Sequence, residues 1–464
     1  MNITIAINCI ISIITASVRV GDRRLINYGY TSVGTAFEKI IQCSRLRAKS
    51  EMISIADAYK RVLAENIISK SNIPPYDTSH MDGFAVKAKA TEYASLFKPV
   101  FLKIKSRRTA DSSGRPDSHN LNRIRPLSTS SSHDTLRSGE AFEIATGGYL
   151  PKRADTIIPI EEVTIVGNKI KVDCPFPKGA YVYPIGADIK YKELIFSKGQ
   201  SLRTQDVGLL GSLGIKKVIV IKKPTVGLIP TGSELSDDID HIAPFQKFNT
   251  NSGVIARLIQ EAGGLPTDFG ITSDDIKAIL QKLSNALDTC DLIITMGGTS
   301  VGKHDLVQMA INSLGKPGMI AHGIKLDRGR VSGLAVLKGK PIVCLPGPIQ
   351  AALNAFIVFA YPMIRILSGR LRRETGLIFY ANLTKCWQAR KKFPDFLKVV
   401  YVKLSYCKNS FKAQPLAGET ESMSLLSKAN GYILVPEKVT KMIAGQTVPV
   451  YLLPGFSSIN EEFI

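Results

Sequence analysis

The sequence predicts a multidomain α/β protein whose central part is a parallel sheet covered by helices on both faces. The chain has 464 residues, enough for about three domains of ordinary size. Between about residues 202 and 365, short apolar strand-like segments alternate with segments of helical periodicity. After residue 369 a basic linker leads into short apolar runs that are typical of β structure. These three observations place the α/β core in the middle of the chain and a β-rich domain at its end.

Composition and charge exclude several classes of protein. Apolar residues make up 44% and charged residues 21%, which rules out a collagen-like, coiled-coil or wholly disordered chain. Lys and Arg total 60 against 39 Asp and Glu, a formal charge of +21, which favours anionic partners such as phosphates, oxyanions, nucleic acid or acidic lipid. None of the seven cysteines forms a C-x-x-C pair, so we expect no zinc knuckle or disulfide framework and a reducing cytoplasm as the setting.

The first 28 residues need a separate interpretation. Met1–Val18 carries no charge and is rich in Ile, so it could be a signal segment or a short membrane anchor. No basic region precedes it, and Asn2 and Asn8 interrupt it, which favours a plain N-terminal extension. No other segment is expected to be long and apolar enough to span a bilayer.

The N-terminal part predicts helices followed by short strands. Apolar residues at Val33, Phe37 and Ile40 recur at helical spacing, and the apolar residues between 53 and 63 predict a second helix. The two prolines of Asn72–Asp77 end that pattern in a turn. Residues 105–138 are rich in Ser, Lys and Arg and predict an exposed insertion. Short apolar runs separated by turns follow from residue 141 to residue 196.

The central part shows the alternation that defines the fold class. Strands are predicted at Val226–Ile229, Asp291–Thr295 and Ile342–Leu345. A helix is predicted over Thr250–Ala262, and a long apolar helix follows the last strand to about Leu367. Strand, helix, strand spacing of this kind indicates parallel strands buried on both faces.

Three of these strands end in segments rich in glycine or hydroxyl residues. The segments are Thr231–Ser233, Gly297–Gly302 and Pro346–Gly347. Ligands bind beyond the carboxyl ends of parallel strands, and glycine lets backbone N–H groups approach an anion. One such segment alone is usually a tight turn. Three in one sheet can equally well be explained by the binding of a phosphate-bearing ligand or by structural turns. None has P-loop or G-x-G-x-x-G spacing, which disfavours ordinary ATP and NAD sites.

Four carboxylates are candidate ligands for a Mg²⁺ ion held between protein and phosphate, namely Asp82, Asp188, Asp274 and Asp305. Asp82 follows the rigid Pro-Pro turn, and Asp305 follows the glycine-rich segment. Each alone is better explained as a turn residue or a helix cap, with Asp274 a candidate N-cap and Asp305 at the start of a helix. The six histidines show no spacing typical of metal ligands.

Four motifs carry a family resemblance, and their order along the chain makes it specific. They are Pro75–Val86, Ile144–Pro151, Met296–Asp305 and Ser427–Gly431. Together they resemble the molybdopterin molybdotransferase family of the MoeA type, which includes the C-terminal E domain of gephyrin. The resemblance covers about residues 29–453.

The resemblance implies a four-part subunit with a three-layer, Rossmann-like molybdopterin-binding domain, smaller α+β and β domains, and a C-terminal β-barrel-like domain. The implied boundaries are 1–28 for the extension, 29–75 with 170–205 for a discontinuous linker domain, 76–169 for a second small domain containing the insertion, 206–370 for the α/β domain, and 371–464 for the barrel-like domain.

The resemblance also implies a reaction: Mg²⁺-dependent insertion of molybdate, or tungstate, into adenylyl-molybdopterin with release of AMP. Family members are homodimers whose cleft joins the second domain of one subunit to the α/β domain of the other. The catalytic residues carried over from the motifs are Asp82, Thr146 and Asp274, and the metal ligands are Asp82, Asp188, Asp274 and Asp305. The residues expected to contact substrate are Thr231, Gly232, Gly297, Gly298, Thr299, Ser300, Gly302, Arg330 and Gly347.

The chain departs from the family pattern at two anion-binding segments. Where the family has Lys-Pro-Gly-Lys-Pro, the first lysine is Asp327 and the second is Arg330. We expect Arg330 to take over the anion contact and Asp327 to weaken it, unless Arg328 or Arg330 neutralises the Asp327 carboxylate. Pro346–Ala351 lacks an Asn and a Ser of the family motif, and Pro348 removes an N–H donor.

These departures keep a second hypothesis open, a non-catalytic paralogue that binds molybdopterin or acts as a scaffold. A third hypothesis, a nucleic-acid-binding protein selected for its charge, is disfavoured because no base-stacking or groove-reading motif occurs in the sequence. No membrane partner is expected.

Overall fold

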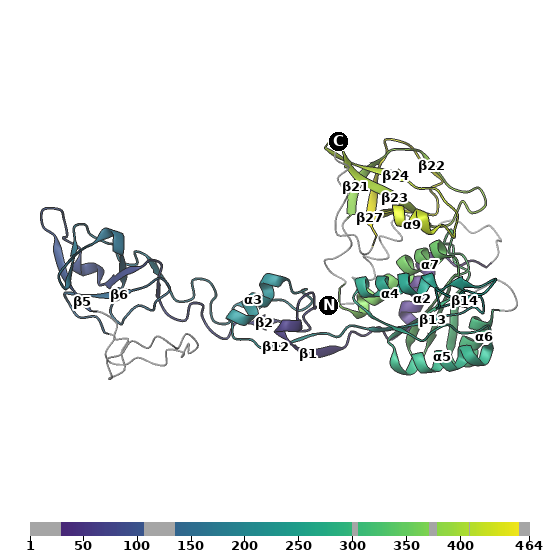
Figure 1. The fold of residues 1–464 in the computed structure, drawn as a ribbon, viewed down its shortest axis with the longest axis horizontal. Coiled ribbons are helices and arrows are strands. Elements are labelled where there is room, and N and C mark those ends of the chain that lie inside the picture. Colours follow the sequence, from purple (N-terminus) through teal and green to yellow (C-terminus); the bar gives the residue numbers. More distant parts are fainter. Residues whose placement is uncertain (1–28, 106–134, 299–304, 371–377, 408, 454–464) are drawn as a thin grey trace. The chain divides into compact units, whose positions relative to one another are not determined.

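The computed structural model describes residues 29–105, 135–298, 305–370, 378–407 and 409–453 (Figure 1). The chain divides into two compact units. The small unit consists of residues 65–198 and 204–216, and the core unit of residues up to 64, 199–203 and those from 217 onwards. The predictions for the N-terminal extension, for most of the Ser-rich insertion and for Thr299, Ser300 and Gly302 lie outside the described residues.

A six-stranded sheet forms the small unit, with strand order β7-β4-β6-β5-β9-β8. Its strands are β4 (Gly83–Val86), β5 (Val100–Lys105), β6 (Glu140–Ile144), β7 (Thr156–Pro159), β8 (Thr164–Val166) and β9 (Lys169–Val172). All four residues of β4 are buried, because Phe84 and Val86 pack into one cluster and Ala85 into another. The unit also contains β2 (Ile67–Ile68), β3 (Thr78–Ser79), β10 (Val182–Tyr183), β11 (Leu194–Phe196) and α3 (Thr204–Ser212).

The sheet of the core unit has the order β16-β13-β17-β20-β19-β18. Its strands are β13 (Thr225–Pro230), β16 (Leu265–Asp268), β17 (Leu292–Met296), β18 (Pro317–His322), β19 (Gly333–Leu337) and β20 (Lys340–Leu345). The first four strands in the sheet are parallel, as predicted, but β19 runs antiparallel to both of its neighbours, β20 and β18. The two-residue turn Lys338–Gly339 explains this difference, because both residues have positive φ, 52° and 77°, the geometry of a tight hairpin.

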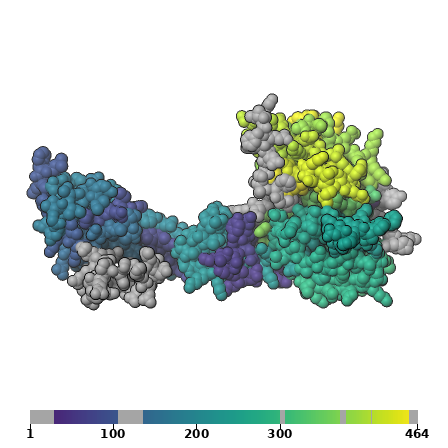
Figure 2. All heavy atoms as spheres, viewed as in Figure 1, coloured from purple at the N-terminus to yellow at the C-terminus, as the bar shows by residue number. Residues whose placement is uncertain are grey.

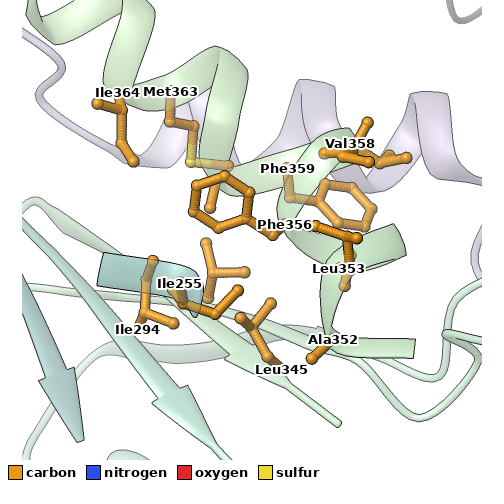
Figure 3. Packing of buried hydrophobic residues seen from close by; sticks show 14 of the residues in the cluster. Ile255, Ile294, Leu345, Ala352, Leu353, Phe356, Val358, Phe359, Met363 and Ile364 are labelled. Carbon is orange, nitrogen blue, oxygen red and sulfur yellow. The ribbon is translucent and has the colours of Figure 1, made fainter. Parts of the chain in front are cut away.

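Helices cover both faces of this sheet and complete the predicted three layers. One face carries α2 (Val33–Cys43), α4 (Thr250–Ala262) and a helix made of α7 (Ile349–Ala355), a π-helical segment (Phe356–Ala360) and α8 (Tyr361–Leu367). The other face carries α5 (Ile276–Thr289) and α6 (Leu306–Ser313). Figure 3 shows Phe356, Phe359 and Met363 above Ile294 and Leu345 of the sheet.

The helix Ile349–Leu367 corrects one expectation, because it is long and apolar enough to span a bilayer by length and composition. It is 19 residues long, and 89% of its most apolar window is buried inside the protein. Its side chains fill the largest hydrophobic cluster of the core unit. Its apolar character is therefore that of a core helix packed between sheet and barrel.

The predicted second helix over residues 53–63 is wrong. Residues Ser50–Ser54 form strand β1, which pairs antiparallel with β12 (Lys217–Ile221), and only a short 3-10 turn follows at Ile55–Asp57. Exposed and partly buried residues alternate along β1, and Leu63 forms a bridge to Val220 of β12. The apolar residues that suggested a helix face a strand more than 150 positions away, which a local pattern does not reveal.

The C-terminal domain is a closed barrel of strand order β21-β24-β23-β25-β27, as predicted. The strands are β21 (Ile378–Leu383), β23 (Lys398–Cys407), β24 (Ser410–Pro415), β25 (Gly431–Val435) and β27 (Thr447–Leu452). The pair β22 (Trp387–Gln388) and β26 (Lys441–Met442) and the helix α9 (Met423–Lys428) accompany them. The barrel packs against the α7–α8 face, where Tyr401 and Tyr432 join the core cluster. Figure 2 shows the barrel residues, in yellow, lying against the α/β domain, in green.

Candidate functional site

The carboxyl ends of three neighbouring strands open onto one cavity of about 520 Å³ in the core unit. Residues from all three of the predicted strand-end segments line it, including Thr231, Gly297 and Gly347. The remaining lining residues are Pro230, Glu234, Leu235, Lys247, Phe248, Asn249, Thr250, Asn251, Met296, Pro348, Ile349, Glu421 and Met423. The topology explains this convergence, because β13, β17 and β20 are adjacent and parallel.

Glycine is required at the wall where β17 ends. Gly297 has φ +87°, and a Cβ added there would overlap the carbonyl oxygen of Thr231. Gly298 has φ +64°, and a Cβ there would lie 2.8 Å from Val307 of α6. Thr231 is held by its backbone N–H and its hydroxyl, which both donate to the Met296 carbonyl at 2.8 and 3.1 Å. The wall is therefore built from backbone, with no room for a side chain.

Several cavity residues were missed by the sequence reasoning. Asn251 donates from Nδ2 to the Gly347 carbonyl at 2.7 Å and so joins the start of α4 to the end of β20. Lys247 and Phe248 form the two-residue strand β15, which pairs with β14 (Leu235–Ser236). Glu421 comes from the barrel domain. The polar run Asn249–Asn251 at the start of a predicted helix was an available signal, whereas nothing local marks Glu421.

Asp274 lies close to the first strand end. Its Oδ2 accepts from the Ser233 backbone N–H at 3.1 Å, and its own N–H donates to the Ser233 hydroxyl at 3.2 Å. The expected helix cap is instead its neighbour Asp275, whose side chain accepts from the Ala278 N–H at the start of α5. Asp274 is therefore free of the capping role and remains exposed beside Thr231–Ser233.

Asp305 is the N-cap of α6, as expected, and is buried. Its Oδ1 accepts from the Gln308 backbone N–H at 2.9 Å. Its Oδ2 lies 3.2 Å from Nε2 of His322, on β18. The sequence reasoning did not single out His322, because β18 lies in the antiparallel part of the sheet that was not predicted.

In the small unit, Asp82 and Thr146 form a pair. Asp82 Oδ1 accepts from the Thr146 backbone N–H at 2.7 Å and from its hydroxyl at 2.8 Å. These two bonds, the backbone one first, lower the pKa of the exposed Asp82 carboxyl. Asp188 is also in the small unit and is exposed, and its backbone N–H donates to the Ile73 carbonyl at 3.0 Å.

The four candidate metal ligands thus divide between the units, Asp82 and Asp188 in one and Asp274 and Asp305 in the other. Within the part of the chain that the structure describes, no three His, Cys, Asp or Glu side chains gather in a group that could hold a metal ion.

The turn that departs from the family pattern is tied to the barrel domain. Asp327 forms an ion pair with Arg390, and its side chain is only 14% exposed. The Arg330 guanidinium lies over the Phe393 ring, 5.1 Å from its centroid. Arg328 donates to the Gln350 side chain, and desolvation lowers its pKa. The arginine that neutralises Asp327 is therefore Arg390, which the sequence reasoning did not consider.

Comparison with known proteins agrees with this architecture. The model of the MoeA N-terminal region, domains I and II, matches residues 31–214. A model described as "Probable molybdopterin binding domain" matches residues 227–366. The model of the MoeA C-terminal region, domain IV, matches residues 380–453. The fold and the cavity therefore define a multidomain protein built around a domain of the molybdopterin-binding type.

Relatives of known identity match over most of the chain. The molybdopterin molybdenumtransferase of Bacillus subtilis is 27% identical over 414 residues, covering 88% of this chain and 90% of its own length. Molybdopterin molybdenumtransferase 2 of Mycobacterium tuberculosis is 27% identical over 406 residues, covering 86% and 94%. The crystal structure of a molybdopterin biosynthesis MoeA protein from Pyrococcus horikoshii superposes with a TM-score of 0.77 at 28% identity, covering 92% of this chain and 100% of its own. The chain belongs to the MoeA family.

Proposed function

We propose that this protein is a molybdopterin molybdenumtransferase of molybdenum cofactor biosynthesis, which inserts molybdate into adenylyl-molybdopterin and releases AMP. The observation that carries the proposal is the cavity at the three strand ends, most of whose lining residues lie inside the segment that matches the molybdopterin-binding model. The names of the Bacillus and Mycobacterium relatives support the same reaction.

The cavity suits a phosphate-bearing ligand on its glycine side. Gly297 and Gly347 present backbone without a side chain in the way. Among the residues that line the cavity, Lys247 is the cation, and it faces the same space as Glu234 and Glu421. We assign the substrate's phosphate to the Gly297 side and to Lys247. Asp274, held beside Ser233, lies at the rim of the same strand ends.

Asp82 fits the role of a Mg²⁺ ligand or of a group at the reacting oxyanion. Its Oδ1 is occupied by Thr146, and the lowered pKa keeps the carboxyl ionised at neutral pH. Single carboxylates, rather than a protein-only cluster, suit Mg²⁺, because this ion is commonly shared with substrate phosphates. When bound, Mg²⁺ would supply positive charge beside the phosphate.

We further propose that the protein is cytoplasmic and a homodimer, with the second domain of one subunit meeting the α/β domain of the other, and that it uses Mg²⁺. The family resemblance supports these points. Tungstate is the alternative oxyanion substrate. A non-catalytic paralogue is the less favoured alternative, because the relatives over most of this chain are named as transferases.

The test is a direct assay of the purified full-length chain with adenylyl-molybdopterin, Mg²⁺ and molybdate, or tungstate in a parallel sample. AMP release that depends on the oxyanion is the expected result. Asp82→Asn should keep its fold, checked by circular dichroism and thermal melting, and lose most of the activity. Binding of adenylyl-molybdopterin by the wild-type protein without AMP release would favour the non-catalytic alternative.

A further inference from the structure

A line of small and polar residues crosses four strands of the core sheet at the level where the parallel strands end. Strand register pairs Thr295 of β17 with Cys344 of β20, Cys344 with Gly333 of β19, and Gly333 with His322 of β18. Directly opposed residues point to the same face of a sheet. That face is the one covered by α6, whose N-cap is Asp305.

Two buried polar atoms in this region lack a hydrogen-bond partner among the described residues. They are Asp305 Oδ2 and His322 Nε2. These two atoms lie 3.2 Å apart without the alignment of a hydrogen bond. Leaving a buried carboxylate oxygen unpaired is costly, and within the described part of the chain His322 Nε2 lies 3.2 Å from it.

The surroundings limit what this group can do. The Cys344 thiol is buried, and burial raises its pKa to about 12, so it stays a neutral thiol. A Cβ at Gly333 would lie 3.3 Å from Cys344 Cβ, so the position opposite His322 holds no side chain. Among the residues that the structure describes, neither a thiolate nor a third metal-ligating side chain accompanies the pair.

The pair does connect to the cavity wall. Asp305 Oδ1 caps α6, and the first turn of α6 carries Val307. Val307 abuts Gly298, where an added Cβ would lie 2.8 Å away. Gly298 follows Gly297, which lines the cavity. A shift of the Asp305 carboxylate would therefore move the start of α6 and the glycine wall with it.

We propose that His322 is a positioning residue for the molybdopterin site. With Nε2 protonated, His322 lies 3.2 Å from Asp305 Oδ2 and restrains that carboxylate electrostatically, so that Oδ1 stays on the α6 cap and the Gly297–Gly298 wall keeps the shape that substrate needs. The proposal rests on the proposed function and adds a residue to that same site.

The first experiment compares His322→Leu with His322→Gln, whose amide N–H₂ can replace the imidazole donor. We expect His322→Leu to raise the KM for adenylyl-molybdopterin about tenfold with a smaller change in kcat, and His322→Gln to recover most of the loss. In an Asp305→Asn background, His322→Leu should raise the KM by less than about twofold, because the carboxylate that His322 contacts is already absent. The proposal would be overturned if the effects of His322→Leu and Asp305→Asn on KM were fully additive. It would also be overturned if His322→Leu and His322→Gln had the same KM.

The second experiment does not depend on catalysis. Nitrogen-15 NMR of labelled histidines, with the His322 signal assigned through His322→Gln, should show Nε2 as the protonated ring nitrogen. Asp305→Asn should change that signal more than those of the other five histidines. An unprotonated Nε2 in the wild-type protein would refute the role of His322, even if His322→Leu failed to fold. If the wild-type chain bound no adenylyl-molybdopterin while the NMR result held, the proposed function would fail and the Asp305–His322 pair would stand.

Discussion

At the residue scale, the chemistry of Asp82 is set by one neighbour. Thr146 supplies both hydrogen bonds to Oδ1, and the backbone bond is the larger cause of the lowered pKa. Thr146→Val removes the hydroxyl and keeps the N–H, so the Asp82 pKa should rise part of the way towards its ordinary value. Carbon-13 NMR titration of the carboxyl measures this, with the exposed Thr164→Val as control. An unchanged Asp82 titration in Thr146→Val would contradict the assignment.

The same pair predicts a pH dependence of stability. Because the folded-state pKa of Asp82 is lowered, its contribution is present above the unfolded-state value and is lost as pH falls through the folded-state pKa. Thr146→Val should therefore have a lower free energy of unfolding than the wild type at pH 7. The difference between the two proteins should become smaller at pH 3. Urea unfolding at pH 7 and pH 3 measures this difference. The same difference at both pH values would show that the Thr146 hydroxyl stabilises the fold independently of the ionisation of Asp82.

A second residue-scale prediction concerns Asp327. Its ion pair with Arg390 is largely screened from solvent on the Asp side, so Asp327→Lys places two cations together. We expect a loss of about 1–3 kcal/mol in the free energy of unfolding. Arg390→Glu should restore part of it in the double variant, which would re-form the pair with reversed charge. Wild-type stability of Asp327→Lys in urea unfolding would show that the pair has no structural role.

At the element scale, two glycines of the cavity wall behave differently. Gly297 has positive φ and no room for a Cβ, whereas Gly347 has nothing within 4 Å of one. Gly297→Ala should lower the melting temperature, because left-handed strain alone costs about 1–3 kcal/mol. Gly347→Ala should melt like the wild type and lose affinity only if ligand lies against that backbone. Equal melting temperatures of the two variants would contradict the geometry of the Gly297 wall.

The barrel depends on a buried lysine. Lys398, at the start of β23, is 2% exposed and donates to the carbonyls of Pro394, Glu437 and Val439 at 2.5–3.1 Å. Lys398→Met keeps the volume and leaves these carbonyls unpaired, so we expect a loss of about 1–3 kcal/mol. The exposed Lys441→Met is the control, and thermal unfolding is the measurement. If Lys398→Met melts at the same temperature as the wild type, water must satisfy the three carbonyls.

At the scale of the whole molecule, the predicted catalytic residues fall in both compact units, Asp82 in the small unit and Asp274 in the core unit. If the proposed dimer forms its sites from two subunits, mixing Asp82→Asn with Asp274→Asn after subunit exchange should regenerate intact sites. Activity should return to about a quarter of the wild type for random mixing. One variant is isotope-labelled so that native mass spectrometry can detect mixed dimers. If mixed dimers form and the mixture is as inactive as each variant alone, each site lies within one chain.

The sequence by itself determined the layered architecture and the location of the cavity. The helix Thr250–Ala262 has the predicted bounds, because its apolar spacing and the glycine after it are local signals. The glycine-rich strand ends converge, because parallel strands bring their carboxyl ends to one edge. The four ordered motifs already indicated the MoeA family.

Only the tertiary structure decided which distant residues complete the site. Residues 50–54 became a strand because β12 offered an edge, against their local pattern. Arg390 meets Asp327 across 63 positions, and Glu421 reaches the cavity from the barrel. His322, at the end of β18, lies 3.2 Å from Asp305, and β18 is held in the sheet by its antiparallel pairing with β19. Such contacts join residues far apart along the chain and leave no periodic trace in it, so packing alone specifies them.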